Sequence, residues 1–188
     1  ASAPALLRGR RGGLRAGLWL LAAALLINTW VIIGRWMEGG RPPFKTLFET
    51  LLFYPWCVTT VTLILLGLHR LWVLIPFSAA ASLAGLGYAL YRPDADIVNL
   101  PPALQSGWFV PHVVTYFVSY AALFASFVLA VCALFRPRWR PSGSPEGAPG
   151  LDHFAHLAAG FGIVSLTLGR VMGAVWGKYA WGDYWSWD

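Results

Sequence analysis

Charged residues are scarce in this chain: they make up 12% of its 188 amino acids, whereas roughly a quarter of a soluble globular domain is charged. Hydrophobic residues account for 57%, and the mean hydropathy is +0.59. This composition excludes an ordinary soluble domain and predicts an integral membrane protein. Because each transmembrane helix needs about 20 residues, the length suits one compact bundle of spans. We expect residues 1–188 to form a single integral-membrane domain.

Cysteine is also rare. Cys57 and Cys132 both lie inside apolar runs, and no CxxC spacing occurs. A disulfide framework, a zinc site and a thiol redox motif therefore lack support, and the pattern predicts two buried, inert thiols. The formal net charge of +6 does not indicate nucleic-acid binding, because the arginines gather in residues 8–15 and 136–140, as the positive-inside rule of membrane proteins would place them.

Five apolar stretches predict an all-α fold, a polytopic transmembrane helix bundle. Each stretch is long enough to span, because in lipid only a helix of that length satisfies its own backbone hydrogen bonds. The predicted spans cover residues 14–36, 47–68, 71–91, 110–135 and 157–176. The first stretch is too long for a signal peptide, and no small-residue cleavage site follows it.

The distribution of basic residues predicts a cytoplasmic N-terminus. This orientation places on the inner side Arg8, Arg10, Arg11, Arg15, Arg70, Arg136, Arg138 and Arg140, and on the outer side Arg35, Arg41, Lys45, Arg92 and Lys178. Residues 137–150, rich in Pro, Gly and Ser, are then a flexible inner loop. Three segments face outward: residues 37–46, 92–109 and a tryptophan-rich segment, 177–188.

Tryptophan is concentrated near the end of the sequence. Trp176, Trp181, Trp185 and Trp187 lie within twelve residues. One explanation is an aromatic belt at the membrane–water interface. The other is a binding platform: if residues 181–188 are helical, Trp181, Trp185 and Asp188 share a face that can stack on a flat apolar ligand.

His112 directly follows Pro111 at the outer end of the fourth predicted span, where proline suits a first helical turn. A lone histidine at a helix end is usually a satisfied polar group. Its location on the same side of the membrane as the tryptophans favours a second role, because imidazole is a common axial ligand of haem iron.

The remaining histidines carry weaker signals. His153 and His156 lie three residues apart at the inner end of the fifth span, where they either face water or share a metal. His69, followed by Arg70, fills a tight inner turn and is predicted to be solvated.

Arg170 lies inside the fifth span, where a charge is costly and suggests function. Three explanations are open: it snorkels outward, pairs with Glu49, or meets an acidic ligand group. Glu49 itself lies in the first turn of the second span, where the helix dipole favours an acid. Arg41 and Lys45 either have a structural role or receive carboxylates of a bound ligand. The proline-broken loop LPPALQSGWF leads into His112, under the tryptophans.

The final residues, WGDYWSWD, resemble the WGxxWxWD signature of the cytochrome c assembly protein family. Its fixed positions are occupied by Trp181, Gly182, Trp185, Trp187 and Asp188. The similarity extends through LTLGRVMGAVW just before the signature, LPPALQSGWFVPHVVTYFVSYAAL around His112, and PPFKTLFETLLF in the second span. It covers most of the chain from residue 42 onward and is greatest to the branch that contains CcsA and ResC of system II.

The resemblance implies a haem site. In that family the tryptophan-rich segment is an extracytoplasmic haem-binding surface, and flanking spans each supply an external histidine as an axial iron ligand. By similarity, His112 is the metal ligand, and the other cofactor-binding residues are Trp176, Trp181, Gly182, Trp185, Trp187 and Asp188. The second histidine would follow one further span. The family pattern continues past Asp188 with Pro-Lys-Glu, so we expect this sequence to be a fragment. Arg170 stands where an apolar residue is expected.

The resemblance also implies a function: presenting haem, at the outer face of the bacterial cytoplasmic membrane, to the reduced CxxCH thiols of apocytochrome c. The implied partners are a system II membrane protein similar to CcsB or ResB and thiol-reducing proteins. The vinyl and thiol groups carry the bond chemistry, while the protein binds and orients. No general base or nucleophile is evident, so the sequence does not predict that this chain alone is an active haem lyase.

Two other functions stay open. The first is a haem delivery or export module that hands haem to a chaperone. The second is a transporter or packing subunit without a cofactor, which would place polar residues along a pathway through the membrane. Apart from Arg170 and Glu49, the predicted spans offer little of that kind.

Overall fold

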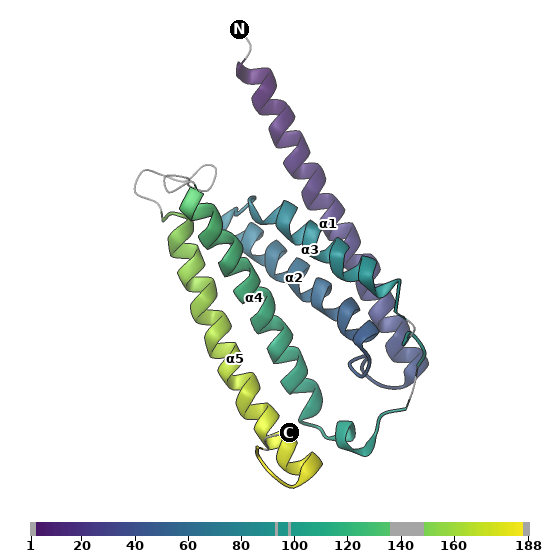
Figure 1. Ribbon diagram of the computed structural model, residues 1–188. Helices are drawn as coiled ribbons and strands as arrows, with labels where there is room; N and C mark the ends of the chain where they lie inside the picture. Colours follow the sequence, from purple (N-terminus) through teal and green to yellow (C-terminus); the bar gives the residue numbers. More distant parts are fainter. Residues whose placement is uncertain (1–2, 93, 98, 136–148, 186–188) are drawn as a thin grey trace.

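The computed structural model describes residues 3–92, 94–97, 99–135 and 149–185, with side chains described from residue 12 onward. These residues are all-helical, as predicted. They form five α-helices, which lie side by side as an elongated bundle, and one short 3-10 helix in the loop before α4 (Figure 1). In order they are α1 (Ala3–Gly39), α2 (Leu47–His69), α3 (Leu74–Ala89), η1 (Pro102–Gln105), α4 (Phe109–Phe135) and α5 (Leu151–Trp181).

Four of these helices, α1, α2, α4 and α5, are long and apolar enough to cross a membrane. The third predicted span corresponds to α3, which has 16 residues and therefore rises only about 24 Å, against about 30 Å of hydrocarbon. Helix α3 is short because α2 ends at His69 and Arg70 adopts a left-handed conformation, with φ of 55°. The chain then turns through residues 71–73 before the next helix begins.

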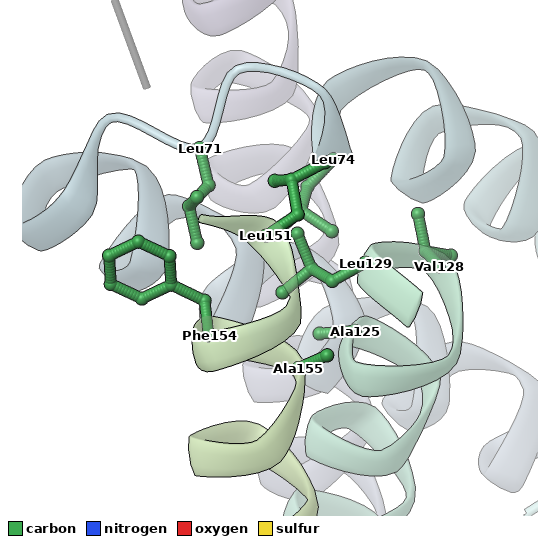
Figure 2. Packing of buried hydrophobic residues seen from close by; sticks show 8 residues of the cluster. All are labelled: Leu71, Leu74, Ala125, Val128, Leu129, Leu151, Phe154 and Ala155. Carbon is green, nitrogen blue, oxygen red and sulfur yellow. The ribbon is translucent and has the colours of Figure 1, made fainter. Parts of the chain in front are cut away.

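One end of the bundle is closed by a cluster of buried apolar side chains that joins this turn to α4 and α5 (Figure 2). Leu71 and Leu74 come from the turn and the start of α3, and Leu129 comes from α4. Phe154 and Ala155 belong to the first turns of α5. Since Leu71 and Leu129 are 0% exposed, this cluster fixes the α2–α3 turn against the α4–α5 pair.

Helices α4 and α5 run antiparallel, and polar side chains of α4 bond at regular intervals to backbone carbonyls of α5. Ser126 donates to the Ala155 carbonyl at 2.8 Å, and Ser119 donates to the Gly162 carbonyl at 2.7 Å. Seven residues before Ser119 on α4, the His112 ring bonds to the carbonyl of Gly169, which lies seven residues after Gly162 on α5. This ladder sets the register of the two helices.

Candidate functional site

The imidazole of His112 is held by α5. Its Nδ1 lies 2.8 Å from the Gly169 carbonyl oxygen. A carbonyl oxygen only accepts hydrogen bonds, so Nδ1 carries the proton and Nε2 keeps its lone pair. This is the tautomer that a ligating histidine needs, because the bond made by one ring nitrogen determines what the other can bind.

Glycines of α5 make room for the aromatic side chains of α4. A Cβ atom added to Gly173 would lie 2.5 Å from Cε1 and 2.7 Å from Nδ1 of the His112 ring. A Cβ atom on Gly169 would lie 2.7 Å from the ring of Tyr116. The absence of a side chain at both positions therefore allows the His112 ring to lie directly on the α5 backbone.

Trp176 completes the surroundings of His112. The two rings are stacked, with centroids 5.6 Å apart and planes inclined by 23°. Phe109 contacts the same indole at 5.4 Å. The indole Nε1 donates to the Ala103 carbonyl at 2.8 Å, so the loop that contains η1 lies against Trp176, consistent with its predicted place under the tryptophans.

The end of the bundle that holds Trp176 and Trp181 is termed the tryptophan end. Trp181 meets Trp176 edge to face, with centroids 4.7 Å apart. Helix α5 stops at Trp181 because Gly182 takes φ of 91°, a left-handed conformation that favours glycine. Trp185 thus follows a bend rather than a helical turn, so the shared helical face proposed for Trp181 and Trp185 does not form. Trp181 and Trp185 are 66% and 68% exposed.

Two predicted binding residues, Trp187 and Asp188, lie outside the described residues. A third predicted binding residue, Gly182, is the C-cap of α5, and its N–H donates to the Lys178 carbonyl. The structure therefore brings together His112, Trp176 and Trp181, and ends helix α5 at the point where the signature begins.

An ionic cluster stabilises the N-terminal end of α2, which lies at the same end of the bundle as Trp176 and Trp181. The carboxylate of Glu49, which is 1% exposed, accepts hydrogen bonds from Nη1 and Nη2 of Arg41, at 3.1 and 3.0 Å, and from Nη2 of Arg35 at 3.4 Å. The backbone N–H groups of Lys45 and Thr46 bond to the same carboxylate. Pairing of Glu49 with Arg170, one of the three explanations open for that arginine, is therefore excluded, and Glu49 lies in the first turn of α2, where the helix dipole favours an acid.

The loop before α4 is tied to this cluster. Arg35 also donates to the Ala95 carbonyl at 2.8 Å, and the ammonium group of Lys45 donates to the Asn99 carbonyl. Asp94 accepts the N–H groups at the start of α2, and the hydrogen bond from Arg92 lowers the pKa of its carboxyl below the usual range. Groups of the protein itself are thus the partners of Arg35, Arg41 and Lys45.

The other three histidines lie at the opposite end of the bundle. His69 and His153 each contact the ring of Phe154, and His156 bonds to the Asp152 carbonyl of its own helix. His153 and His156 are exposed, as expected for water-facing residues. Within the described part of the chain, no group of three or more potential ligands could hold a metal ion.

The cysteine prediction is confirmed in part. Cys57 is 1% exposed inside the cluster formed by α2, α1 and α4, whereas Cys132 is only half-buried.

Comparison with known proteins gives a consistent result. The family model described as "Cytochrome C assembly protein" matches residues 44–188. A cytochrome c biogenesis protein CcsA of Synechococcus sp. (strain CC9605) is 34% identical over 210 residues, covering 93% of this chain and 68% of the relative. The protein of that name from Parasynechococcus marenigrum (strain WH8102) is 33% identical, covering 90% and 66%. The one from Chlamydomonas reinhardtii is 31% identical, covering 90% and 50%. The chain thus spans between half and about two-thirds of these relatives.

Proposed function

The chain belongs to the cytochrome c assembly protein family, and from this premise we propose that it binds haem at the tryptophan end and presents it for covalent attachment to apocytochrome c. The observation that carries the proposal is the hydrogen bond between His112 Nδ1 and the Gly169 carbonyl. This hydrogen bond leaves the lone pair of Nε2 free to bind iron. The imidazole is already oriented by Trp176 and by the α5 backbone.

Aromatic rings near His112 support the proposal of a porphyrin site. Trp176 and Trp181 offer flat apolar rings next to the imidazole, and Trp185 is exposed nearby in sequence. Aromatic contacts of this kind contribute about 0.5–1.5 kcal/mol each beyond burial. We include Gly182, Trp187 and Asp188 in the proposed site because they occupy the fixed positions of the signature.

Each residue has a binding or orienting role. His112 would hold the iron, and the tryptophans would support the ring, while each cysteine S–H of a CxxCH motif adds across a haem vinyl group to form a thioether. We propose that this takes place on the outer face of the bacterial cytoplasmic membrane, with a CcsB- or ResB-like membrane protein and thiol-reducing proteins as partners. The bias of basic residues supports that orientation.

A haem titration of the purified protein tests the proposal. We expect one haem to bind with the Soret band of a histidine-ligated iron. Replacing His69, His153 and His156 together by alanine leaves His112 as the sole histidine and is expected to change neither stoichiometry nor Soret position, because those three lie at the opposite end. Failure of the wild-type protein to bind haem, or loss of the histidine-ligated band in the triple variant, would contradict the proposal.

Substituting Gly173 with alanine is expected to weaken haem binding by about tenfold or more, as other changes that misorient a metal ligand do. The new methyl group would overlap Cε1 and Nδ1 of His112 and push the ring off the α5 backbone. Gly160→Ala is the matched control, since nothing lies within 4 Å of a Cβ atom there and the residue belongs to the same helix. Equal haem affinity in both variants would refute the role of Gly173.

A further inference from the structure

Arg170 is an exposed charge inside a helix that is long and apolar enough to cross a membrane. Helix α5 runs from Leu151 to Trp181, so Arg170 lies four residues, about 6 Å, from its middle. The neighbouring Leu168 and Val171 are 52% and 59% exposed, as lipid-facing side chains are. A guanidinium in such surroundings is costly unless an anion accompanies it.

The Cα–Cβ bond of Arg170 is directed away from the tryptophan end. In an α-helix the Cα–Cβ bonds tilt toward the N-terminus, which for α5 lies at the opposite end of the bundle. Arg170 directly follows Gly169, whose carbonyl bonds to the His112 ring and whose Cα faces the ring of Tyr116. Tyr120 follows Ser119, which bonds to Gly162 of α5, two turns nearer the opposite end than Arg170. This geometry favours a guanidinium on the side of Tyr116 and Tyr120 over one that snorkels toward the tryptophan end.

The described residues provide no carboxylate for Arg170. Their ion pairs join Arg35 and Arg41 to Glu49, and Arg92 to Asp94. In the sequence, α4 contains no acidic residue, and α5 contains none beyond Asp152.

Rings in contact connect Arg170 to the tryptophan end. We call Trp181, Trp176, His112, Tyr116 and Tyr120 the aromatic track. Trp181 contacts Trp176, which stacks on His112. His112 meets Tyr116 at 4.7 Å, and Tyr116 meets Tyr120 at 5.6 Å. The track follows the α4–α5 pair, which lies side by side in Figure 1, and passes Gly169, the residue before Arg170.

A ligand that matches this surface is planar, apolar and carries a carboxylate at one edge. We propose that Arg170 binds a propionate of haem while His112 holds the iron, an inference that rests on the proposed function. Two ring contacts, with centroids 4.7 and 5.6 Å apart, separate His112 from Tyr120. A lipid phosphate is a poorer match, because phosphates lie at the membrane surface while this side chain points toward the middle.

The test compares haem with haem dimethyl ester, which keeps the ring, the iron and the vinyl groups but replaces both carboxylates. Wild-type protein in detergent is expected to bind haem about tenfold to a hundredfold more tightly than the diester, as charge-assisted hydrogen bonds generally provide. Arg170→Leu should reduce the haem affinity to that of the diester, leave the diester affinity unchanged and keep the Soret position. Arg170→Lys should restore part of the difference, and Arg15→Leu, which removes an exposed arginine of α1, should have no effect.

The outcomes separate this inference from the proposed function. If haem binds through His112 but Arg170→Leu leaves its affinity unchanged, or weakens haem and diester equally, Arg170 does not bind a propionate. If the wild-type protein binds neither compound, both the inference and the proposed function are overturned.

Discussion

Replacing His112 by alanine is expected to abolish the histidine-ligated Soret band and to weaken haem binding by at least about tenfold, since even indirect ligand changes cost that much. The imidazole is the only described histidine at the tryptophan end, and its Nδ1 is committed to the Gly169 carbonyl, so the iron depends on Nε2. Absorption titration of the purified variant with haem measures both quantities.

Rescue by free imidazole distinguishes ligation from packing. His112→Gly leaves a space beside Trp176 and Gly173 that imidazole can enter, so adding it should restore the Soret band. His156→Ala, which removes an exposed histidine from α5, serves as the control. The fold should survive, because His112→Ala removes one hydrogen bond, about 1 kcal/mol. An unchanged spectrum in the alanine variant, or one that imidazole does not restore in the glycine variant, would rule out His112 as the ligand.

The helices that the sequence predicts differ from the structure mainly at their ends. Hydropathy identifies only the apolar part of α5, residues 157–176. The helix itself begins at Leu151, and its first turns contain the polar residues Asp152, His153 and His156, which a search for apolar stretches leaves out. It extends to Trp181, where Gly182 terminates it. For α3 the predicted span is longer than the helix, because residues 71–73 are apolar but belong to a turn.

Residue types indicated which side chains belong to the candidate site, but not how they are oriented. His112 and Trp176 are recognisable from the signature and its flanking segments, whereas Gly169 and Gly173 matter only through the register of α4 on α5. One signal was available: His112, Ser119 and Ser126 repeat every seven residues on α4, as do Gly162 and Gly169 on α5. Matching heptads of polar and small residues predict a close antiparallel pair.

The ionic cluster around Glu49 illustrates a different limit. A local pattern, Thr46 followed three residues later by Glu49, predicts a capping box, which the structure contains. Arg35 and Arg41, which pair with Glu49, precede α2 in the sequence. The packing of α1 against α2 determines that these two arginines, and not others, reach the carboxylate. Spacing alone cannot give that choice.

Glu49→Ala is expected to lower the free energy of unfolding by about 3–5 kcal/mol, the usual cost of removing one partner of a buried ion pair. The substitution would leave the buried Arg41 guanidinium and the N–H groups of Lys45 and Thr46 without their carboxylate. Glu49→Gln keeps the shape of the side chain and part of the bonding, so a smaller loss is expected. Cys57, which is 1% exposed, reports unfolding through its reaction with a thiol-specific dye in a Cys132→Ser background.

The control for this prediction is Glu38→Ala, which removes an exposed carboxylate from the same end of the bundle. Its thiol reactivity should match that of the parent protein, since a solvated charge contributes little to stability. The large loss is expected to come from burial: Glu49 holds Arg35, and Arg35 holds the Ala95 carbonyl of the loop that leads to α4. Glu49→Ala should therefore also weaken haem binding at His112, which absorption titration measures. Equal dye reaction rates in the Glu49 and Glu38 variants would show that the cluster does not stabilise the protein.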